Sequence, residues 1–286
     1  MNNRNLHQWA AELKSKEKVR QREEKKKKFK IANELGEEVV SLSRFVNSHN
    51  IMRLPLFSTK YVRNGRRTKP IIFNSQDGSV AFEVNGANGI PDQADGNIIR
   101  YAISKARKIR RRIGVTPQRV DVTRYELLKA LGRATSGKNY RKLEESLKCL
   151  AGMQITGNVF AKDSIYTGTL VSFQYTKTPD SKVDKIRIIF NPKLHEHLEQ
   201  EKAVITIPNE ILMETNALRI RLMELVQAGM GYKDKWMMKL SYLKKLCVYD
   251  RELKYFKRDI TRLELPYVLT FIKGDNRQQV VVFTKK

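Results

Sequence analysis

A repeated order of predicted elements constrains the fold of this chain more than any other feature of its sequence. Across residues 97–176, hydrophobic periodicity and turn residues predict a helix, a strand, a short capped helix, a turn, a longer basic helix and two strands. The same order returns across residues 217–284. In each segment a strand leads into a short Leu/Lys helix, with Thr123 and Ser241 as the expected N-cap residues. We therefore infer a tandem duplication.

This order of elements is typical of a winged helix-turn-helix domain. In that domain the second helix of the pair enters the major groove of DNA, and the hairpin lies along the phosphate backbone. The sequence therefore predicts an α+β protein made of two tandem winged helix-turn-helix domains with a basic N-terminal arm. We expect the arm to span residues 1–45, the first domain residues 46–180 and the second domain residues 181–286.

The segments outside the repeat give weaker signals. Residues 52–57, 69–73 and 80–84 are short extended stretches separated by turn residues, and they predict a small antiparallel sheet. The apolar residues Ile31, Leu35, Val39 and Leu42 have helical spacing. They predict an amphipathic helix over residues 29–46 that docks on the main body.

The charge balance indicates the class of partner. The chain of 286 residues has 56 Lys and Arg against 30 Asp and Glu, a formal net charge of +26, while hydrophobic residues make up 41% and suffice for an ordinary core. Such a surface repels itself unless a polyanion neutralises it, and nucleic acid releases counterions when it does so. No window approaches the roughly 18 apolar residues of a transmembrane helix, and the N-terminus lacks a signal-peptide core. We expect a nucleic-acid partner, no membrane, and a cytoplasmic location.

The basic arm has two interpretations. Residues 1–30 are dominated by Lys, Arg and Glu, with four consecutive lysines at residues 25–28. Such a segment cannot bury itself and can form a solvated helix that gains order on a polyanion. A segment that only keeps the protein soluble would have the same composition, so both interpretations stay open.

The segment from residue 250 to residue 263 is the strongest candidate for a DNA-reading helix. At helical spacing, Leu253, Phe256, Ile260 and Leu263 form one core-facing stripe. Basic and aromatic residues gather on the other faces, and Arg suits guanine while Lys and Tyr suit phosphate. The candidate DNA contacts of the second domain are Arg251, Lys254, Tyr255, Lys257, Arg258 and Arg262, with Lys273 and Arg277 on the hairpin. A plain surface helix is the alternative.

The corresponding helix of the first domain carries a weaker signal. Its candidate DNA contacts are Lys138, Asn139, Arg141, Lys142 and Lys148. Because Glu145 lies among them on the outward face, we expect this helix to contact the phosphate backbone more than the bases. The basic run at residues 105–112 can follow phosphates too, or simply face water.

Two motifs resemble catalytic or metal sites. Residues 132–138 match G-x-x-x-x-G-K, but Asn139 replaces the Ser or Thr that holds magnesium, and the motif follows a helix instead of a buried strand. His195 and His197 have the spacing of a paired-histidine nickase site. On the helix predicted there, however, their rings point about 200° apart and cannot share an ion. We expect a turn, no metal site and no catalytic residues.

The remaining chemistry-bearing residues add no site. Cys149 and Cys247 lack Cys-x-x-Cys spacing, which excludes a zinc finger of that type, and buried free thiols are expected. The carboxylates form no pair in an apolar setting that would suit acid and base catalysis. The sequence thus predicts a protein without catalytic activity and without a cofactor.

The chain resembles the plasmid replication initiator (Rep) proteins of the replication initiator protein A type. The resemblance rests on the order and spacing of several stretches across residues 52–263, and no single motif is diagnostic. They are RLPLFS at residues 53–58, KPIIF at 69–73, the helix at 98–109, TRYELLKALGR at 123–133, YRKL at 140–143 with Leu147 and Leu150, and residues 217–225 and 239–247. Residues 1–30 are not part of the pattern.

The resemblance implies a function. Such proteins bind direct repeats (iterons) in double-stranded plasmid origins, melt a neighbouring AT-rich segment, and help to load the host replicative helicase with host initiator proteins. Dimers repress their own gene and monomers start replication, which sets copy number. The base-reading role would then fall on residues 251–262, and the first domain would supply backbone contacts and the dimer surface.

Three other functions remain open at this stage. A transcriptional repressor with tandem winged helices would need no melting activity. A rolling-circle nickase-relaxase would cleave single-stranded origin DNA with a metal ion and a tyrosine. A basic RNA-binding or packaging protein would show no preference for one DNA sequence.

Overall fold

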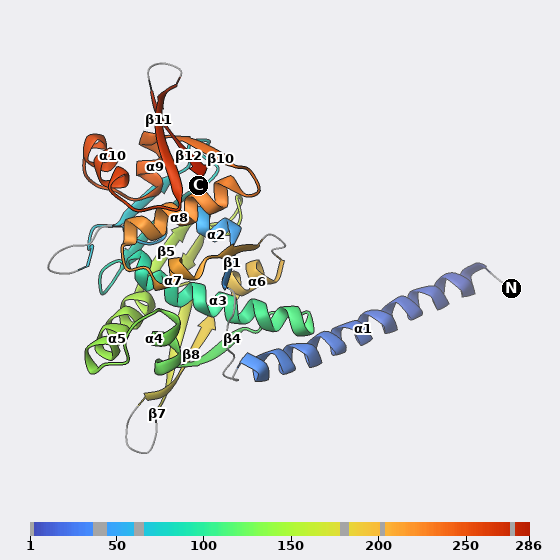
Figure 1. Cartoon of the computed structure of the whole chain (residues 1–286). Helices are drawn as coiled ribbons and strands as arrows, with labels where there is room; N and C mark the ends of the chain where they lie inside the picture. Colours follow the sequence, from blue (N-terminus) through green and yellow to red (C-terminus); the bar gives the residue numbers. More distant parts are fainter. Residues whose placement is uncertain (1–2, 37–44, 60–65, 178–182, 201–203, 275–277) are drawn as a thin grey trace.

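The computed structural model describes residues 3–36, 45–59, 66–177, 183–200, 204–274 and 278–286 (Figure 1). The protein is a mixed α+β structure in which antiparallel sheets alternate with helices. In the part of the chain described, no helix is both long enough and apolar enough to cross a membrane.

The first repeated unit is built around α3 (Gln93–Ile113). This helix is followed by β4 (Arg119–Thr123), α4 (Arg124–Ala130), α5 (Gly137–Ala151), β7 (Val171–Lys177) and β8 (Val183–Phe190). The three strands form an antiparallel sheet in the order β4-β8-β7. The last strand of the unit therefore lies between the other two.

The second repeated unit has the same order and the same strand pairing. It consists of α8 (Ala217–Met230), β10 (Lys235–Lys239), α9 (Leu240–Leu246), α10 (Leu253–Thr261), β11 (Tyr267–Lys273) and β12 (Gln279–Lys285). Its sheet order is β10-β12-β11, so the last strand is again central. The repeat inferred from the sequence is thus present in the topology as well as in the element order.

The first unit contains an insertion that the sequence pattern did not separate. Residues 154–160 and 166–176 were expected to be the two strands of one hairpin. Instead, β5 (Met153–Gly157) and β6 (Tyr166–Gly168) join β2 (Ile71–Asn74) and β3 (Ala81–Gly86) in a sheet ordered β2-β3-β5-β6. The prediction of one strand at residues 166–176 was wrong, because the chain leaves this sheet after β6 and β7 belongs to another sheet. At the turn between the two strands the Tyr166 hydroxyl donates to the Thr169 carbonyl at 2.5 Å.

The remaining elements join the two units and the arm. They are α1 (Asn3–Gly36), β1 (Phe45–Ser48), α2 (His49–Arg53), α6 (Pro192–Gln200), β9 (Val204–Ile207) and α7 (Asn209–Met213). The prediction of an extended stretch at residues 52–57 was wrong for residues 52 and 53, which form the end of α2. The helix expected over residues 29–46 is the last part of α1, whereas residues 45–46 pair with β9 instead; Val39 and Leu42 lie outside the described residues.

The predicted helix starts agree with the structure at one position and differ at two. Thr123 caps α4 in a capping box with Glu126. Ser241 does not cap α9, because that helix already begins at Leu240 and has no side-chain cap. The helix expected from residue 250 starts later, at Leu253, and the Asp250 carboxylate forms an ion pair with Arg67 at 2.6 Å instead of capping it.

Two residues of the basic run at 105–112, Lys105 and Arg107, are buried, which corrects the expectation that the whole run faces phosphate or water. Lys105 is fully buried and donates to the Asp121 carbonyl, and Arg107 is buried too. Arg110 donates to the Leu198 carbonyl at 2.6 Å. Of this run, Arg111 and Arg112 are exposed at the helix end. The helix is a central support of the fold, so it cannot follow phosphates along its length.

Buried polar contacts join α3 to the second unit. The Arg100 guanidinium meets the Glu224 carboxylate through Nε to Oε1 at 2.5 Å and Nη2 to Oε2 at 2.8 Å. Both side chains are at least 96% buried, with exposed fractions of 4% and 1%. Asn97 donates from Nδ2 to the Ile211 carbonyl at 3.0 Å, beside α8. These contacts fix α3 against α7 and α8.

Candidate nucleic-acid interface

Two apolar side chains anchor α10 to the second unit. Phe256 and Ile260 are fully buried, as the periodicity predicted, while Leu253 at the helix start is 36% exposed. The side chains of Arg251, Lys254 and Arg258 keep 54%, 66% and 43% of their surface exposed. Arg262 is exposed as well. The helix therefore presents a basic outer face supported by a narrow apolar stripe.

Tyr255 is the centre of that outer face. Its ring lies 4.3 Å from the Arg251 guanidinium carbon, 4.9 Å from the Lys254 ammonium and 5.2 Å from the Arg258 guanidinium carbon. Cation–π contacts of this kind hold long basic side chains near one ring. We call Arg251, Lys254, Tyr255 and Arg258 the α10 cluster.

Asp259 is an acidic member of this surface and is not among the residues predicted to contact DNA. It accepts hydrogen bonds from Arg258 and from the Tyr249 hydroxyl, and Arg251 lies 3.8 Å away. Burial acts to raise the pKa of Asp259, but the hydrogen bonds from Tyr249 and Arg258 together bring it below its usual value. The carboxylate stays charged and orients two arginines of the surface.

Lys257 and the hairpin residues occupy different surroundings. The Lys257 ammonium lies 4.5 Å from the centre of the Phe271 ring on β11, so this lysine joins α10 to the hairpin instead of pointing outward with the α10 cluster. Lys273 is exposed at the end of β11. Arg277 lies outside the described residues.

The first-unit candidates lie on α5 with less mutual contact. Lys138, Arg141, Lys142 and Lys148 are exposed, and so is Glu145. Asn139 donates from Nδ2 to the Ala134 carbonyl at 2.8 Å, so its amide is used within the turn before the helix. The G-x-x-x-x-G-K motif is this turn, and Ser136 caps α5 through the Asn139 backbone N–H.

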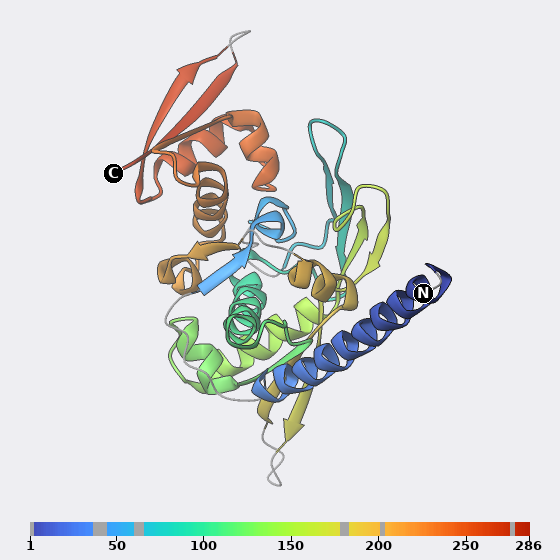
Figure 2. The ribbon, with the colours of Figure 1, turned by 90° about the vertical axis from the view of Figure 1, so that its right-hand side faces the viewer.

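The two basic helices share one side of the molecule. In Figure 1, α10 and α5 both lie on the side opposite to α1. The β11–β12 and β7–β8 hairpins project from opposite ends, as both views show (Figure 2). The described surface thus offers a helix and a hairpin from each unit along one elongated side.

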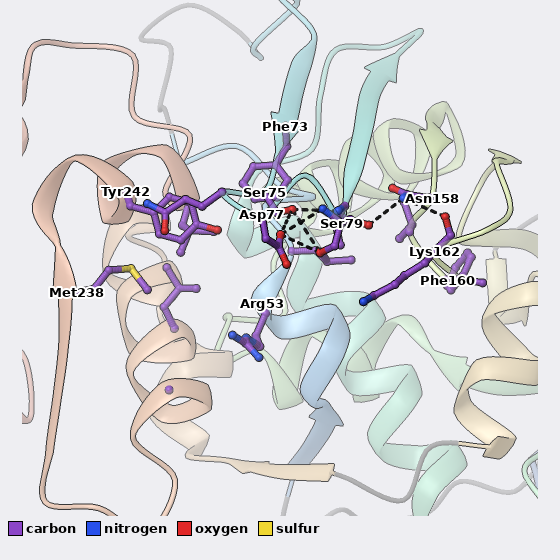
Figure 3. Close-up of a pocket in the computed structure, with 18 of the residues that line it drawn as sticks. Arg53, Phe73, Ser75, Asp77, Ser79, Asn158, Phe160, Lys162, Met238 and Tyr242 are labelled. Carbon is purple, nitrogen blue, oxygen red and sulfur yellow. Dashed lines mark hydrogen bonds between the residues drawn. The ribbon is translucent and has the colours of Figure 1, made fainter.

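A cleft of about 670 Å³ lies between the units (Figure 3). It is lined by the β2–β3 turn and residues 158–162 on one side, and by α8, β10 and α9 on the other. Asp77 accepts hydrogen bonds there from Ser75 and Ser79, which lower its pKa to about 2. A carboxylate held in this state is a poor proton donor or acceptor near neutral pH, so the cleft offers no acid–base pair through Asp77.

The paired histidines face different neighbours. His195 Nε2 lies 2.9 Å from the Thr116 carbonyl oxygen, and its ring packs edge-on against Phe29 of α1. The His197 ring packs against Phe160 instead. Among the described residues no group of three or more His, Cys, Asp and Glu could hold a metal ion. The two rings are thus structural contacts of α6.

Both cysteines are buried free thiols, as predicted. Cys149 donates from Sγ to the Gly89 carbonyl at 3.0 Å, and Cys247 lies at the end of α9. Burial raises the pKa of each thiol to about 12. Neither is a reactive thiolate near neutral pH.

Two crystal structures of RctB fragments resemble this fold. The crystal structure of selenomethionine derivatives of domains 2 and 3 of RctB has a TM-score of 0.57 at 13% identity, and the match covers 83% of this chain and 98% of that chain. A second crystal structure of RctB domains 2–3 has a TM-score of 0.52 at 12% identity and covers 84% and 97%. At these identities the likeness concerns the fold alone.

The sequence comparisons give the family. Comparison with curated protein sequences gave no match. The model of the family described as Replication initiator protein A matches residues 46–267, which include both repeated units up to the start of β11. The chain therefore belongs to the Replication initiator protein A family.

Proposed function

We propose that this protein is a plasmid replication initiator that binds direct repeats in double-stranded origin DNA through two winged helix-turn-helix domains. The observation that carries the proposal is the α10 cluster: exposed basic residues gathered around Tyr255 on a helix whose opposite face is fixed by Phe256 and Ile260. Membership of a replication initiator family supports the same function.

The shared topology supports the winged-helix assignment. In a winged helix-turn-helix domain the strand after the first helix pairs with the wing strands, and the second helix of the pair is the recognition helix. α4 and α5 form that pair in the first unit, and α9 and α10 form it in the second. β8 lies beyond residue 180 but pairs with β4 and β7, so we place the division between the domains after β8, later than residue 180.

The two recognition helices have different proposed roles. Arg258 on α10 and Arg251 just before it are the candidates for reading bases, and Lys254, Tyr255 and Arg262, which follows α10 directly, are candidates for phosphate contacts. Lys257 would act by tying α10 to the hairpin that carries Lys273 and Arg277. On α5, Lys138, Arg141, Lys142 and Lys148 would contact phosphate, since no cluster with a central aromatic ring forms there. Asn139 would act within the turn.

Further steps are part of the proposal. Melting of the origin, recruitment of the host helicase and initiator proteins, self-association and repression of the protein's own gene are each consistent with an initiator of this family. A repressor with two winged helices is the second candidate, because the same described surface would serve it. No cofactor and no catalytic residue enters either function.

A footprint on the DNA that flanks the gene tests the proposal. The purified protein is bound at about 150 to 200 mM salt with excess competitor DNA, where binding by charge alone is strongly weakened. Regularly spaced protected repeats in phase with the helical turn support the initiator, above all if the adjacent AT-rich segment becomes sensitive to a single-strand reagent. Protection of one inverted repeat at the promoter without melting favours the repressor. Cleavage of single-stranded origin DNA would instead identify a nickase, and a smear without discrete protection a non-specific binder.

A further inference from the structure

We propose that α1 carries a second DNA-binding surface, so that one molecule bridges the duplex held by α5 and α10 to a separate DNA segment. The bridging part of this inference rests on the proposed function, because it takes α5 and α10 as the first binding surface. The α1 surface itself stands on its own contacts and charges.

The C-terminal end of α1 is fixed to the body. Ala32 is fully buried, the Phe29 ring packs edge-on against His195, and the Asn33 Oδ1 accepts a hydrogen bond from the Gln118 backbone N–H at 3.0 Å. Gly36 lies so close to the Arg119 carbonyl oxygen that a Cβ atom there would be 2.5 Å from it. These contacts set the direction in which the rest of the helix leaves the body.

The free part of α1 has a basic stripe on one face. Lys14, Lys18, Arg22 and Lys25 are separated by four, four and three residues, so they line up at about 6 Å steps along one side of a helix. All four are exposed. The same face carries Phe29 and Ala32 further along, so the stripe continues the docking face beyond the body. We call these four residues the α1 stripe.

The acids of this helix lie away from the stripe. At about 100° per residue, Glu17, Glu23 and Glu24 fall on the opposite and lateral faces, and Glu24 pairs with Lys28 at 2.8 Å. A solvated helix would be expected to mix both signs around its circumference. A stripe without acids over several turns instead suits a polyanion.

The body does not neutralise the stripe where the two come closest. Lys25 lines a small pocket with α6, whose nearest carboxylates are Glu196 and Glu199. Glu196 pairs with Lys193 at 3.1 Å, and Glu199 accepts a hydrogen bond from the Thr116 backbone N–H at 2.9 Å. Both carboxylates thus contact other groups, and among the described residues neither forms an ion pair with Lys25.

The position of α1 decides which DNA it can meet. The helix leaves the body on the side opposite to α5 and α10 (Figure 1). With 34 residues it extends about 50 Å, and most of that length projects beyond the body. A duplex lying across α5 and α10 is therefore not the segment that the stripe contacts. α1 also precedes the family match at residues 46–267, so this surface adds to what the family members share.

A DNA-bridging assay tests the proposal with the full-length protein. Bead-bound duplex carrying the protected repeats is loaded with protein, and the capture of a labelled duplex without repeats is measured at about 150 mM salt. The stripe variant carries Lys14→Gln, Lys18→Gln, Arg22→Gln and Lys25→Gln. The matched control carries Lys16→Gln, Arg20→Gln, Lys27→Gln and Lys28→Gln, which removes the same charge from the faces that hold the acids.

The proposal expects the stripe variant to lose capture at least tenfold and the control variant to lose less than threefold, with the footprint on the bead-bound duplex unchanged in both. Equal losses in the two variants would overturn it, because total charge and not the stripe would then bind. Undiminished capture by the stripe variant would overturn it as well. If no repeats are protected at all, the proposed function fails. The stripe is then tested with a bead-bound duplex and a labelled duplex that both lack repeats, and the protein-dependent capture is compared for the same two variants.

Discussion

The Arg258 guanidinium donates two hydrogen bonds to the Asp259 Oδ1, from Nε at 3.0 Å and from Nη2 at 2.9 Å. Adjacent residues of opposite charge thus form a pair on the outer surface of α10, and the same carboxylate also holds Tyr249. The acid limits the rotamers of Arg258 before DNA arrives. Such preorganisation lowers the entropy lost when an arginine meets a base.

Arg258→Ala is expected to weaken binding to the protected repeats by about 1–3 kcal/mol, because one bidentate base contact is worth that much discrimination. Affinity for random duplex should change far less. Fluorescence anisotropy with both duplexes at one salt concentration gives the comparison, with Lys254→Ala as a control that should weaken both alike. Equal losses for Arg258→Ala on the two duplexes would reduce it to a phosphate contact.

Asp259→Asn is expected to lower sequence discrimination without lowering affinity for random DNA. The variant removes a negative charge near phosphate and also removes the carboxylate that orients Arg258 and Arg251. The ratio of the two dissociation constants should fall about tenfold, within the 1–3 kcal/mol of one base contact. A matched loss of binding to random DNA would show that the acid only supports the fold of α10.

Arg100→Met is expected to reduce the free energy of unfolding by about 3–5 kcal/mol, because Glu224 then loses its main partner in a buried site. Urea unfolding at neutral pH measures the loss. The double variant Arg100→Met, Glu224→Gln should lose less than the two single variants combined, since the charges depend on each other. Strictly additive losses would contradict a direct interaction.

The buried thiols predict the behaviour at high pH. The pKa of Cys247 is raised to about 12 in the folded state, above the usual value of an unfolded thiol. The protonated Cys247 thiol therefore contributes fully to the free energy of unfolding below the unfolded pKa near 8.5. This contribution is lost as pH rises from there toward 12. Unfolding midpoints measured across that window for the native chain and for Cys247→Ala should converge as pH rises.

A thiol reagent at neutral pH should label Cys149 and Cys247 only after denaturation, and rapid labelling of the native protein would disprove their burial.

Local patterns predicted the parts of the fold that depend on neighbours in sequence. The stripe of Phe256 and Ile260, the Thr123 N-cap and the β11–β12 hairpin all arise from residues a few positions apart. The exposed candidates on α10 followed from the same periodicity. These features are determined by helix geometry and turn chemistry, which a single sequence carries.

Features that depend on distant partners could not be predicted. Lys105 looked like a solvent-facing residue because helical periodicity treats every charge as an outer residue, yet Asp121 and β4 cover it. The sequence predicted Asp250 as a helix start, but its carboxylate pairs with Arg67, which lies far earlier in the chain and could not be foreseen as its partner. The change of sheet between β6 and β7 has the same origin, since strand partners are chosen by the tertiary fold.

The buried contact of α3 with α8 has a consequence for the DNA as well. Arg100 and Glu224 join the two units through a buried ion pair, which opposes a change in the separation of α5 and α10. Duplex DNA turns once in about 10–10.5 base pairs, so if both helices bind DNA as proposed, their target presents its two parts at one rotational phase. Moving the two parts of the target apart by half a turn would put one of them on the opposite side of the duplex, and we expect the affinity to fall.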